Sequence, residues 1–240
     1  MTESAAIVLG VFLGALVSGF SGFAFSAAAG AVLIHVFEPH ASIPLMMGCS
    51  IISQIVTIIA LRRSVQFGTN PILLVGGLFG VALAITALGY VSGQMLRWLF
   101  GAFLAVYATY LLVRTPAAAL SFSGPWSQGV VGTLGGAVGV LTAMPGAVPS
   151  IWCEMRGYSK EQQRGIVQPF IIGMQIFALI LFARSPIGLP DTFLANLLTA
   201  LPPLLLGTYL GALAFQRVDG QIFRKAILLL LILSGLAMLH

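Results

Sequence analysis

The chain has 240 residues, of which 59% are hydrophobic and 7% are charged, and its mean hydropathy is +1.05. Soluble globular domains contain about 45–50% apolar and about 25% charged residues. Six acidic and eleven basic side chains cannot cover a water-soluble particle of 25.2 kDa. The composition therefore excludes a soluble protein and predicts an all-α polytopic membrane protein with one membrane domain.

Charges and turn-forming residues divide the chain into eight uncharged blocks. A spanning helix needs about 20 apolar residues, and most blocks fit this length once loop residues, such as 70–71 and 125–126, are left out. The first and fifth blocks are longer, and glycine and proline interrupt them at residues 19–23 and 139–146. Glycine costs about 1 kcal/mol and proline about 3 kcal/mol in a helix interior, so we expect a broken or re-entrant helix in each. The blocks are 4–34, 41–61, 64–96, 98–113, 115–153, 165–183, 192–216 and 226–239.

An internal repeat relates the two halves of the chain. A shift of about 120 residues places Gly19 on Gly139 and, with one residue more, Gln54 on Gln175. The sequence GQMLR at 93–97 then aligns with GQIFR at 220–224. We expect two four-element membrane repeats at residues 1–114 and 125–240, joined by a linker at 115–124. Twofold repeats of this kind are typical of secondary transporters.

The positions of the basic residues bear on whether the repeats are parallel or inverted. If all eight elements span the membrane, Lys and Arg divide seven to four between its sides. If each broken element is a re-entrant hairpin, nine lie on one side, and only Arg97 and Arg184 lie on the other. The second division follows the positive-inside rule much better. We favour two hairpins, six spans, inverted halves and both termini outside, with eight plain spans as the alternative.

Acidic side chains are missing from the apolar blocks. All six Asp and Glu residues lie at block ends or in loops. Coupling through a buried carboxylate, and intramembrane proteolysis by an aspartate pair, need such groups at depth. His35 and His40 have only Glu38 nearby for a Ser/His/Asp arrangement, and no Cys or His spacing suits a metal. We therefore expect neither an enzyme nor a metal or other cofactor.

The two breaks are the first candidate for a binding site. The N-terminus of a half-helix binds anions through its free N–H groups, and irregular backbone survives at membrane depth only where it lines protein or water. Two breaks matched by the repeat place such donors face to face near the midplane. Close packing of small residues is the alternative interpretation. The candidate substrate-binding residues here are Gly19, Ser21, Gly22, Phe23, Gly139, Thr142, Met144, Pro145 and Gly146.

Polar side chains in the second and sixth blocks are further substrate-binding candidates. Gln54 and Gln175 lie about midway along these blocks, and each amide donates two hydrogen bonds. Ser50, Ser53 and Gln168 lie within two helical turns of them. Hydrogen bonding between helices is the alternative role for each of these side chains.

Arg164 is a candidate for gating or for attracting anions. It lies in the first turn of the sixth block, three residues after Glu161. An arginine at a helix end commonly snorkels to the membrane surface or pairs with a neighbouring carboxylate. Both of these structural roles are alternatives to the functional one.

Each half opens with a glycine-rich segment, GALVSGFSGFAFSAAAG at 14–30 and GVVGTLGGAVGVLTAMPG at 129–146. A polar loop and a helix start with small residues follow, ASIPLMMGCSIISQ at 41–54 and RGIVQPFIIGMQ at 164–175. Over nearly the whole chain this order resembles the TauE/SafE family of sulfite exporters, although the family's runs of consecutive glycines are reduced here. The resemblance implies a multi-pass transporter of the bacterial inner membrane. Its substrates would be small sulfur-containing anions such as sulfite, thiosulfate or sulfonates, or small organic acids.

These observations favour a secondary transporter whose inverted halves rock around a shared anion site, that is, alternating access. An anion channel would use the same donors but would not saturate, and a membrane scaffold would bind no anion. For a weak-acid substrate the proton can travel on the anion itself, so no protein carboxylate is needed. The expected partners are a small anionic substrate and membrane lipid, with a homodimer as an option and no nucleic acid.

Overall fold

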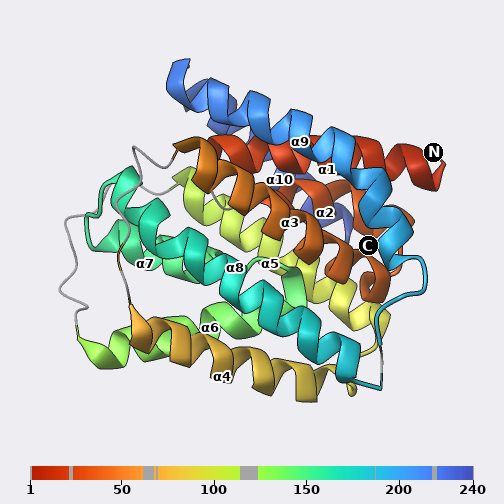
Figure 1. The fold of residues 1–240 in the computed structure, drawn as a ribbon, viewed down its shortest axis with the longest axis horizontal. Coiled ribbons are helices and arrows are strands. Elements are labelled where there is room, and N and C mark those ends of the chain that lie inside the picture. Colours follow the sequence, from red (N-terminus) through yellow and green to blue (C-terminus); the bar gives the residue numbers. More distant parts are fainter. Residues whose placement is uncertain are drawn as a thin grey trace.

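The computed structural model describes residues 2–21, 24–61, 68, 70–113, 124–186, 188–217 and 221–239. Within these ranges the chain folds into helices only, as Figure 1 shows. The predicted all-α fold is confirmed. The helices are α1 (Glu3–Ser21), α2 (Phe25–Val36), α3 (Pro39–Leu61), α4 (Pro71–Leu88), α5 (Gly93–Val113), α6 (Pro125–Thr142), α7 (Ala147–Met155), α8 (Lys160–Arg184), α9 (Phe193–Arg217) and α10 (Gln221–Ala237).

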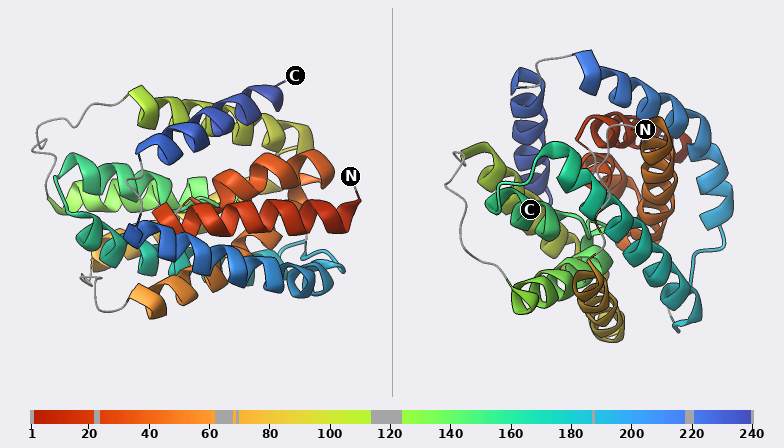
Figure 2. Two further views of the ribbon diagram at one scale, coloured as in Figure 1. Left: turned by 90° about the horizontal axis from the view of Figure 1, so that it is seen from above. Right: turned by 60° about the vertical axis from the view of Figure 1, so that its left-hand side comes forward.

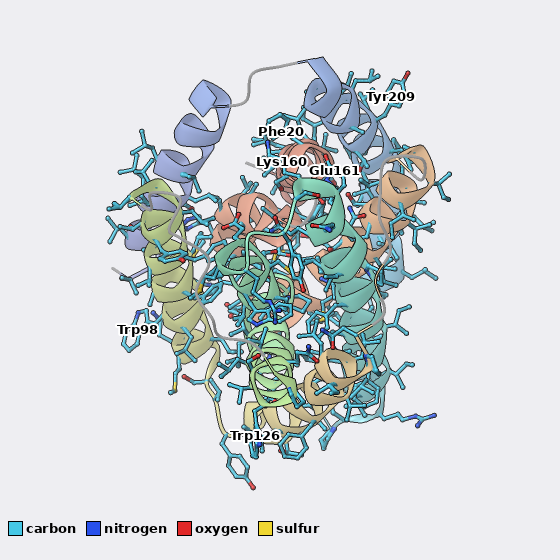
Figure 3. The ribbon with its side chains drawn as sticks, turned by 90° about the vertical axis from the view of Figure 1, so that its left-hand side faces the viewer. Phe20, Trp98, Trp126, Lys160, Glu161 and Tyr209 are labelled. Atoms are coloured by element: carbon cyan, nitrogen blue, oxygen red, sulfur yellow. The ribbon has the colours of Figure 1, made fainter. Side chains whose placement is uncertain are left out.

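By length and composition, six of the described helices are suited to crossing a membrane: α1, α3, α4, α5, α8 and α9. Large apolar side chains on the outside of the bundle, such as Val75 and Phe79, are mostly exposed. Trp98, Trp126 and Tyr209 also point outward in Figure 3. An apolar exterior of this extent is suited to contact with lipid rather than with water. The multi-pass membrane protein predicted from composition is confirmed.

Both predicted breaks are present, and each divides its block into two helices. The first lies between α1 and α2, where Gly22 and Phe23 are outside the described residues. The second lies between α6 and α7, where Ala143 ends α6 in a left-handed conformation with φ of 54°. α2 folds back against α1, and α7 against α6. The eight predicted elements therefore correspond to ten helices.

The two folded-back pairs enter the bundle from opposite ends. Both chain termini lie at one end in Figures 1 and 2, and α1 and α2 enter from that end. α6 begins at the other end, where α3, α5 and α9 finish and α7 connects to α8. An inverted repeat of two re-entrant hairpins requires this arrangement. The repeat itself, its boundaries at 1–114 and 125–240 and its orientation in the membrane stay predictions.

Each folded-back pair packs against a helix from the other half of the chain. The two most extensive interhelical contacts join α1 to α9 and α6 to α4. We call α1, α2, α3 and α9 the first group, and α4, α6, α7 and α8 the second group. α3 packs on α8 between the groups, and α5 packs on α10, as the right-hand view of Figure 2 shows. Each group therefore contains one helix from the other half of the chain, α9 in the first group and α4 in the second.

Glycine allows the backbones of the exchanged helices to touch. A Cβ atom on Gly80 of α4 would overlap the carbonyl oxygen of Thr133 on α6. On α9, a Cβ on Gly211 would overlap the carbonyl oxygen of Leu16 on α1. Helices in membranes associate through such close van der Waals packing, since lipid provides no hydrophobic driving force between them. Within each group, direct contact between backbones therefore holds the exchanged helix in place.

We predict that Gly80→Ala lowers the free energy of unfolding by about 1–3 kcal/mol, the usual cost of overpacking. The new methyl group would have to push α4 away from Thr133. Gly173→Ala on α8 is the matched control, because no atom lies within 4 Å of its Cβ position. The control should be unchanged or more stable by about 0.5–1 kcal/mol. Thermal unfolding in detergent measures both variants, and equal melting temperatures would contradict the close contact of α4 with α6.

Candidate functional site

The second break is held by side chains from two other helices. The carbonyl oxygen of Ala143 accepts a hydrogen bond from Ser26 Oγ at 2.7 Å and another from Gln175 Nε2 at 3.1 Å. Ser26 lies in the first turn of α2, directly after the first break, and Gln175 lies on α8. Each of the three residues is at least 98% buried. The two breaks therefore meet at the carbonyl group of Ala143.

A second set of polar side chains joins α1, α3 and α9. Gln54 Nε2 lies 3.4 Å from Ser18 Oγ in the last turns of α1, and Thr208 Oγ1 on α9 donates to Ser53 Oγ at 3.1 Å. All four side chains are fully buried. These hydrogen bonds tie the polar residues of α3 to both neighbours in the first group.

One face of α8 carries three buried polar side chains. Arg164, Gln168 and Gln175 follow one another at spacings of four and seven residues, which place them on the same side of a helix. Arg164 is 95% buried, and its Nη2 donates to the carbonyl oxygens of Gly19 at 3.3 Å and Phe20 at 2.7 Å. These carbonyls belong to the C-terminal end of α1, where the helix dipole is negative. Figure 3 shows the first residues of α8 beside Phe20.

Arg164 thus turns inward instead of snorkelling to the surface. Its two hydrogen bonds link α8 of the second group to α1 of the first group. They join the two groups at the end where α8 begins. The side chain caps the C-terminal end of α1, and a gating role stays a prediction.

Two hydroxyl candidates at the breaks bond to their own segments. Ser21 Oγ accepts from the backbone N–H of Ala24 at 3.3 Å and so bridges the first break. Thr142 Oγ1 donates to the carbonyl oxygen of Val138 at 2.7 Å, within α6. Both hydroxyls therefore support the local backbone.

The glycine candidates lie where the backbone approaches other atoms closely. A Cβ on Gly19 would lie 2.5 Å from the carbonyl oxygen of Thr208, so Gly19 packs α1 on α9. A Cβ on Gly139 would lie 2.7 Å from the Cβ of Pro145, and one on Gly146 would lie 2.6 Å from Ile171. These glycines shape the turn and its contact with α8. The other candidates in the described chain, Ser50, Met144 and Gln168, are buried.

The helices that begin at the breaks offer backbone donors. The N-cap residues of α2 and α7 are Ala24 and Gly146, and neither makes a side-chain cap hydrogen bond. The first N–H groups of a helix have no partner within the helix. Such N-termini are suited to binding an anion. An anion site at these N-termini stays a prediction.

Several polar atoms near the site have no hydrogen-bond partner. They are Oε1 of Gln54, Oε1 of Gln175 and both amide atoms of Gln168, all of them buried. An unsatisfied buried polar group costs about 1–3 kcal/mol. This cost is removed when water or a substrate supplies the missing hydrogen bond.

Four parts of the site were not among the substrate-binding residues predicted from the sequence: Ser18, Ser26, Thr208 and the backbone of Ala143. Thr208 is one of several hydroxyl side chains in the block 192–216, with Thr199 and Tyr209 among the others, so its signal in the sequence was only weak. Ala143 contributes only its backbone carbonyl, so its residue type carries no signal. Its role depends on the left-handed turn that follows α6.

We predict that Arg164→Gln lowers the free energy of unfolding by about 1.5–3 kcal/mol, the range for hydrogen bonds from a charged group. Arg164→Lys should recover only part of this loss, because an ammonium group lacks the planar fork of guanidinium. Lys160→Gln, an exposed cation one turn earlier in α8, is the control. Thermal unfolding in detergent compares the three variants. Equal melting temperatures for Arg164→Gln and Lys160→Gln would disprove a stabilising contact with α1.

Comparison with known proteins agrees with this architecture. The sequence model described as "Sulfite exporter TauE/SafE" matches residues 6–238. Neither the curated proteins nor the solved structures gave a significant match. The family match covers both breaks and every residue of the candidate site. The chain therefore belongs to the TauE/SafE sulfite exporter family, a family of membrane transporters and not of enzymes.

Proposed function

We propose that the protein carries small sulfur-containing anions, of the sulfite, thiosulfate or sulfonate type, across the bacterial inner membrane by alternating access. The observation that carries this proposal is the meeting of the two breaks at Ala143. Ser26 from one break and Gln175 from α8 hold the carbonyl of the other break. A site of this kind has contributions from both groups of helices.

The chemistry around Ala143 suits an anion. The N-terminus of α2 supplies backbone donors with partial positive charge. In the first turn of α7, the N–H of Ala147 donates to the carbonyl oxygen of Met144, and Pro149 has no N–H. Helix α7 therefore contributes at most the N–H of Val148. Arg164 is the one charged side chain that is buried among the described residues. Such surroundings favour negative charge and offer little to a metal cation.

Alternating access requires contacts that break and re-form between two bodies. The first and second groups are linked by Ser26 to Ala143, by Arg164 to the end of α1, and by the packing of α3 on α8. In the proposed cycle, the groups rock about the α3–α8 contact. Release of Arg164 from α1 would open the end where α8 begins.

The burial of the site favours a carrier over a channel. Gln54, Gln168 and Gln175 are each at least 99% buried. An occluded site is an intermediate of alternating access, whereas a conducting channel has a continuous path. Small organic acids would use the same donors and are the alternative substrate class.

Counterflow into proteoliposomes tests the proposal. The liposomes are preloaded with unlabelled sulfite, thiosulfate, a C2 sulfonate, acetate or chloride, and the matching labelled anion is added outside. We expect saturable counterflow that prefers sulfur anions, since a carrier exchanges its substrate. Empty liposomes are the control. Non-saturating flux would instead indicate a channel, and absence of flux from folded protein would overturn transport altogether.

We predict that Gln54→Ala and Gln175→Ala each weaken anion affinity by about 1.5–3 kcal/mol, the range for a hydrogen bond to a charged group. Because both side chains are buried, folded yield is measured alongside. Gln94→Ala, an exposed glutamine on α5, is the matched control and should change neither quantity. Low yield with normal transport per folded molecule would mean that the two amides are structural.

A further inference from the structure

The orientation of the Gln175 amide is determined by its partner. Amide nitrogen and oxygen are normally assigned from the hydrogen-bond network. Here the partner is the carbonyl oxygen of Ala143, 3.1 Å away, and a carbonyl oxygen can only accept. The atom that faces it must be the nitrogen. The oxygen, Oε1, is therefore left facing elsewhere, buried and without a partner.

Ser26 and Gln54 also present acceptors, whereas Gln168 on the same face of α8 has both its donor and its acceptor unused. Ser26 has a single hydroxyl proton, and it donates this proton to Ala143 at 2.7 Å, so the remaining capacity of Oγ is to accept. On α3, Gln54 uses Nε2 toward Ser18, and its Oε1 is also buried without a partner. The site thus combines unused acceptors with the backbone donors of α2.

This combination selects the protonation state of the substrate. A fully deprotonated oxyanion has only acceptor oxygens, so it would suit the N-terminus of α2 but would be repelled by the amide oxygens. We propose, building on the transport function above, that the site binds oxyanions as monoanions that keep one acidic O–H group, such as hydrogensulfite. The O–H donates to Oε1 of Gln175, and the charged oxygens face the N-terminus of α2. The proton crosses the membrane on the substrate.

The proposal also defines what the site rejects. Sulfonates carry the same charge but have no O–H group at neutral pH, and thiosulfate is fully deprotonated. Both should bind more weakly than hydrogensulfite. The proposal therefore narrows the sulfur anions considered above to those that are weak acids near neutral pH.

Titratable protein groups near Gln175 are few. On α8 itself they are Lys160, Glu161, Arg164 and Arg184, all within the first or last turns. α4 and α6 carry none, and α1 has only Glu3 in its first turn. The other helices that pack around the site carry His35 on α2, His40 and Cys49 on α3, Cys153 and Glu154 on α7, and Tyr209 and Arg217 on α9. The experiment must therefore separate protonation of any of these groups from protonation of the substrate.

Counterflow of sulfite and of selenite by the wild-type protein makes this separation. Both are pyramidal oxyanions, and hydrogenselenite loses its proton at higher pH than hydrogensulfite. With total substrate far below saturation and equal pH on both sides, the rate should fall about tenfold for each pH unit above the second dissociation of the substrate. The falling limb for selenite should lie at higher pH, by the difference between the two dissociation constants. Limbs that coincide would assign the titration to the protein and overturn the proposal.

Methanesulfonate provides the second test. We expect it to inhibit sulfite counterflow at pH 6 at least about tenfold more weakly than unlabelled sulfite does, a ratio equal to the loss of one hydrogen bond to a charged group. Equal inhibition would overturn the inference but leave an anion carrier in place. Absence of saturable flux for every anion would instead remove the transport function itself.

A variant at position 175 tests whether the amide of Gln175 causes the preference for sulfite. Gln175→Met keeps the length of the side chain and removes its acceptor. The preference for sulfite over methanesulfonate should fall toward one, while Gln94→Met on α5 should keep the wild-type ratio. The ratio is measured within one preparation, so a lower yield does not affect it. An unchanged ratio in folded Gln175→Met would exclude Gln175 as the acceptor.

Discussion

The carbonyl oxygen of Ala143 has to find its hydrogen bonds within the protein, because a helix ends there and the residue is almost completely buried. Ser26 and Gln175 provide them, from the first turn of α2 and the middle of α8. The second break is thereby placed against the first, and the oxygen of Gln175 is left buried and without a partner. The hydrogen bonds that satisfy this one buried carbonyl group therefore also bring the residues of the candidate site together.

The positions of the helices and of their breaks could be predicted from the sequence, but the pairing of one helix with another could not. Uncharged runs specify membrane helices, and glycine and proline specify where they break, since both effects act within a few residues. The pairing of α1 with α9 depends on surfaces that meet only in three dimensions, and Gly19 has the same appearance in a packing face as in a binding site. Gln54 and Gln175 could be selected by symmetry. The inward turn of Arg164 and the role of the Ala143 backbone could not, because both depend on where α1 and α6 end.

The packing of the helices determines which parts of the molecule would move as rigid bodies in a rocking motion. The sequence suggests two halves as the moving bodies, but α9 lies on α1 and α4 lies on α6, with backbones in contact. Separation at these surfaces would break many van der Waals contacts at once. Between the groups, the described polar links are a few hydrogen bonds from Ser26 and Arg164, each typically worth about 1 to 3 kcal/mol. A motion that keeps each group intact is therefore much less costly than one that separates the halves.

The exchange of helices also sets an order for assembly during synthesis. α4 precedes α6 closely, so the ribosome delivers both members of this pair almost together. α1 has no such neighbour, because α9 is among the last segments made. Gly19 and the rest of the α1 surface that packs on α9 must therefore wait in the membrane, next to lipid or to the insertion machinery, until nearly the whole chain has emerged. A chain cut short before α9 would keep that face uncovered, which makes it a natural signal for quality control.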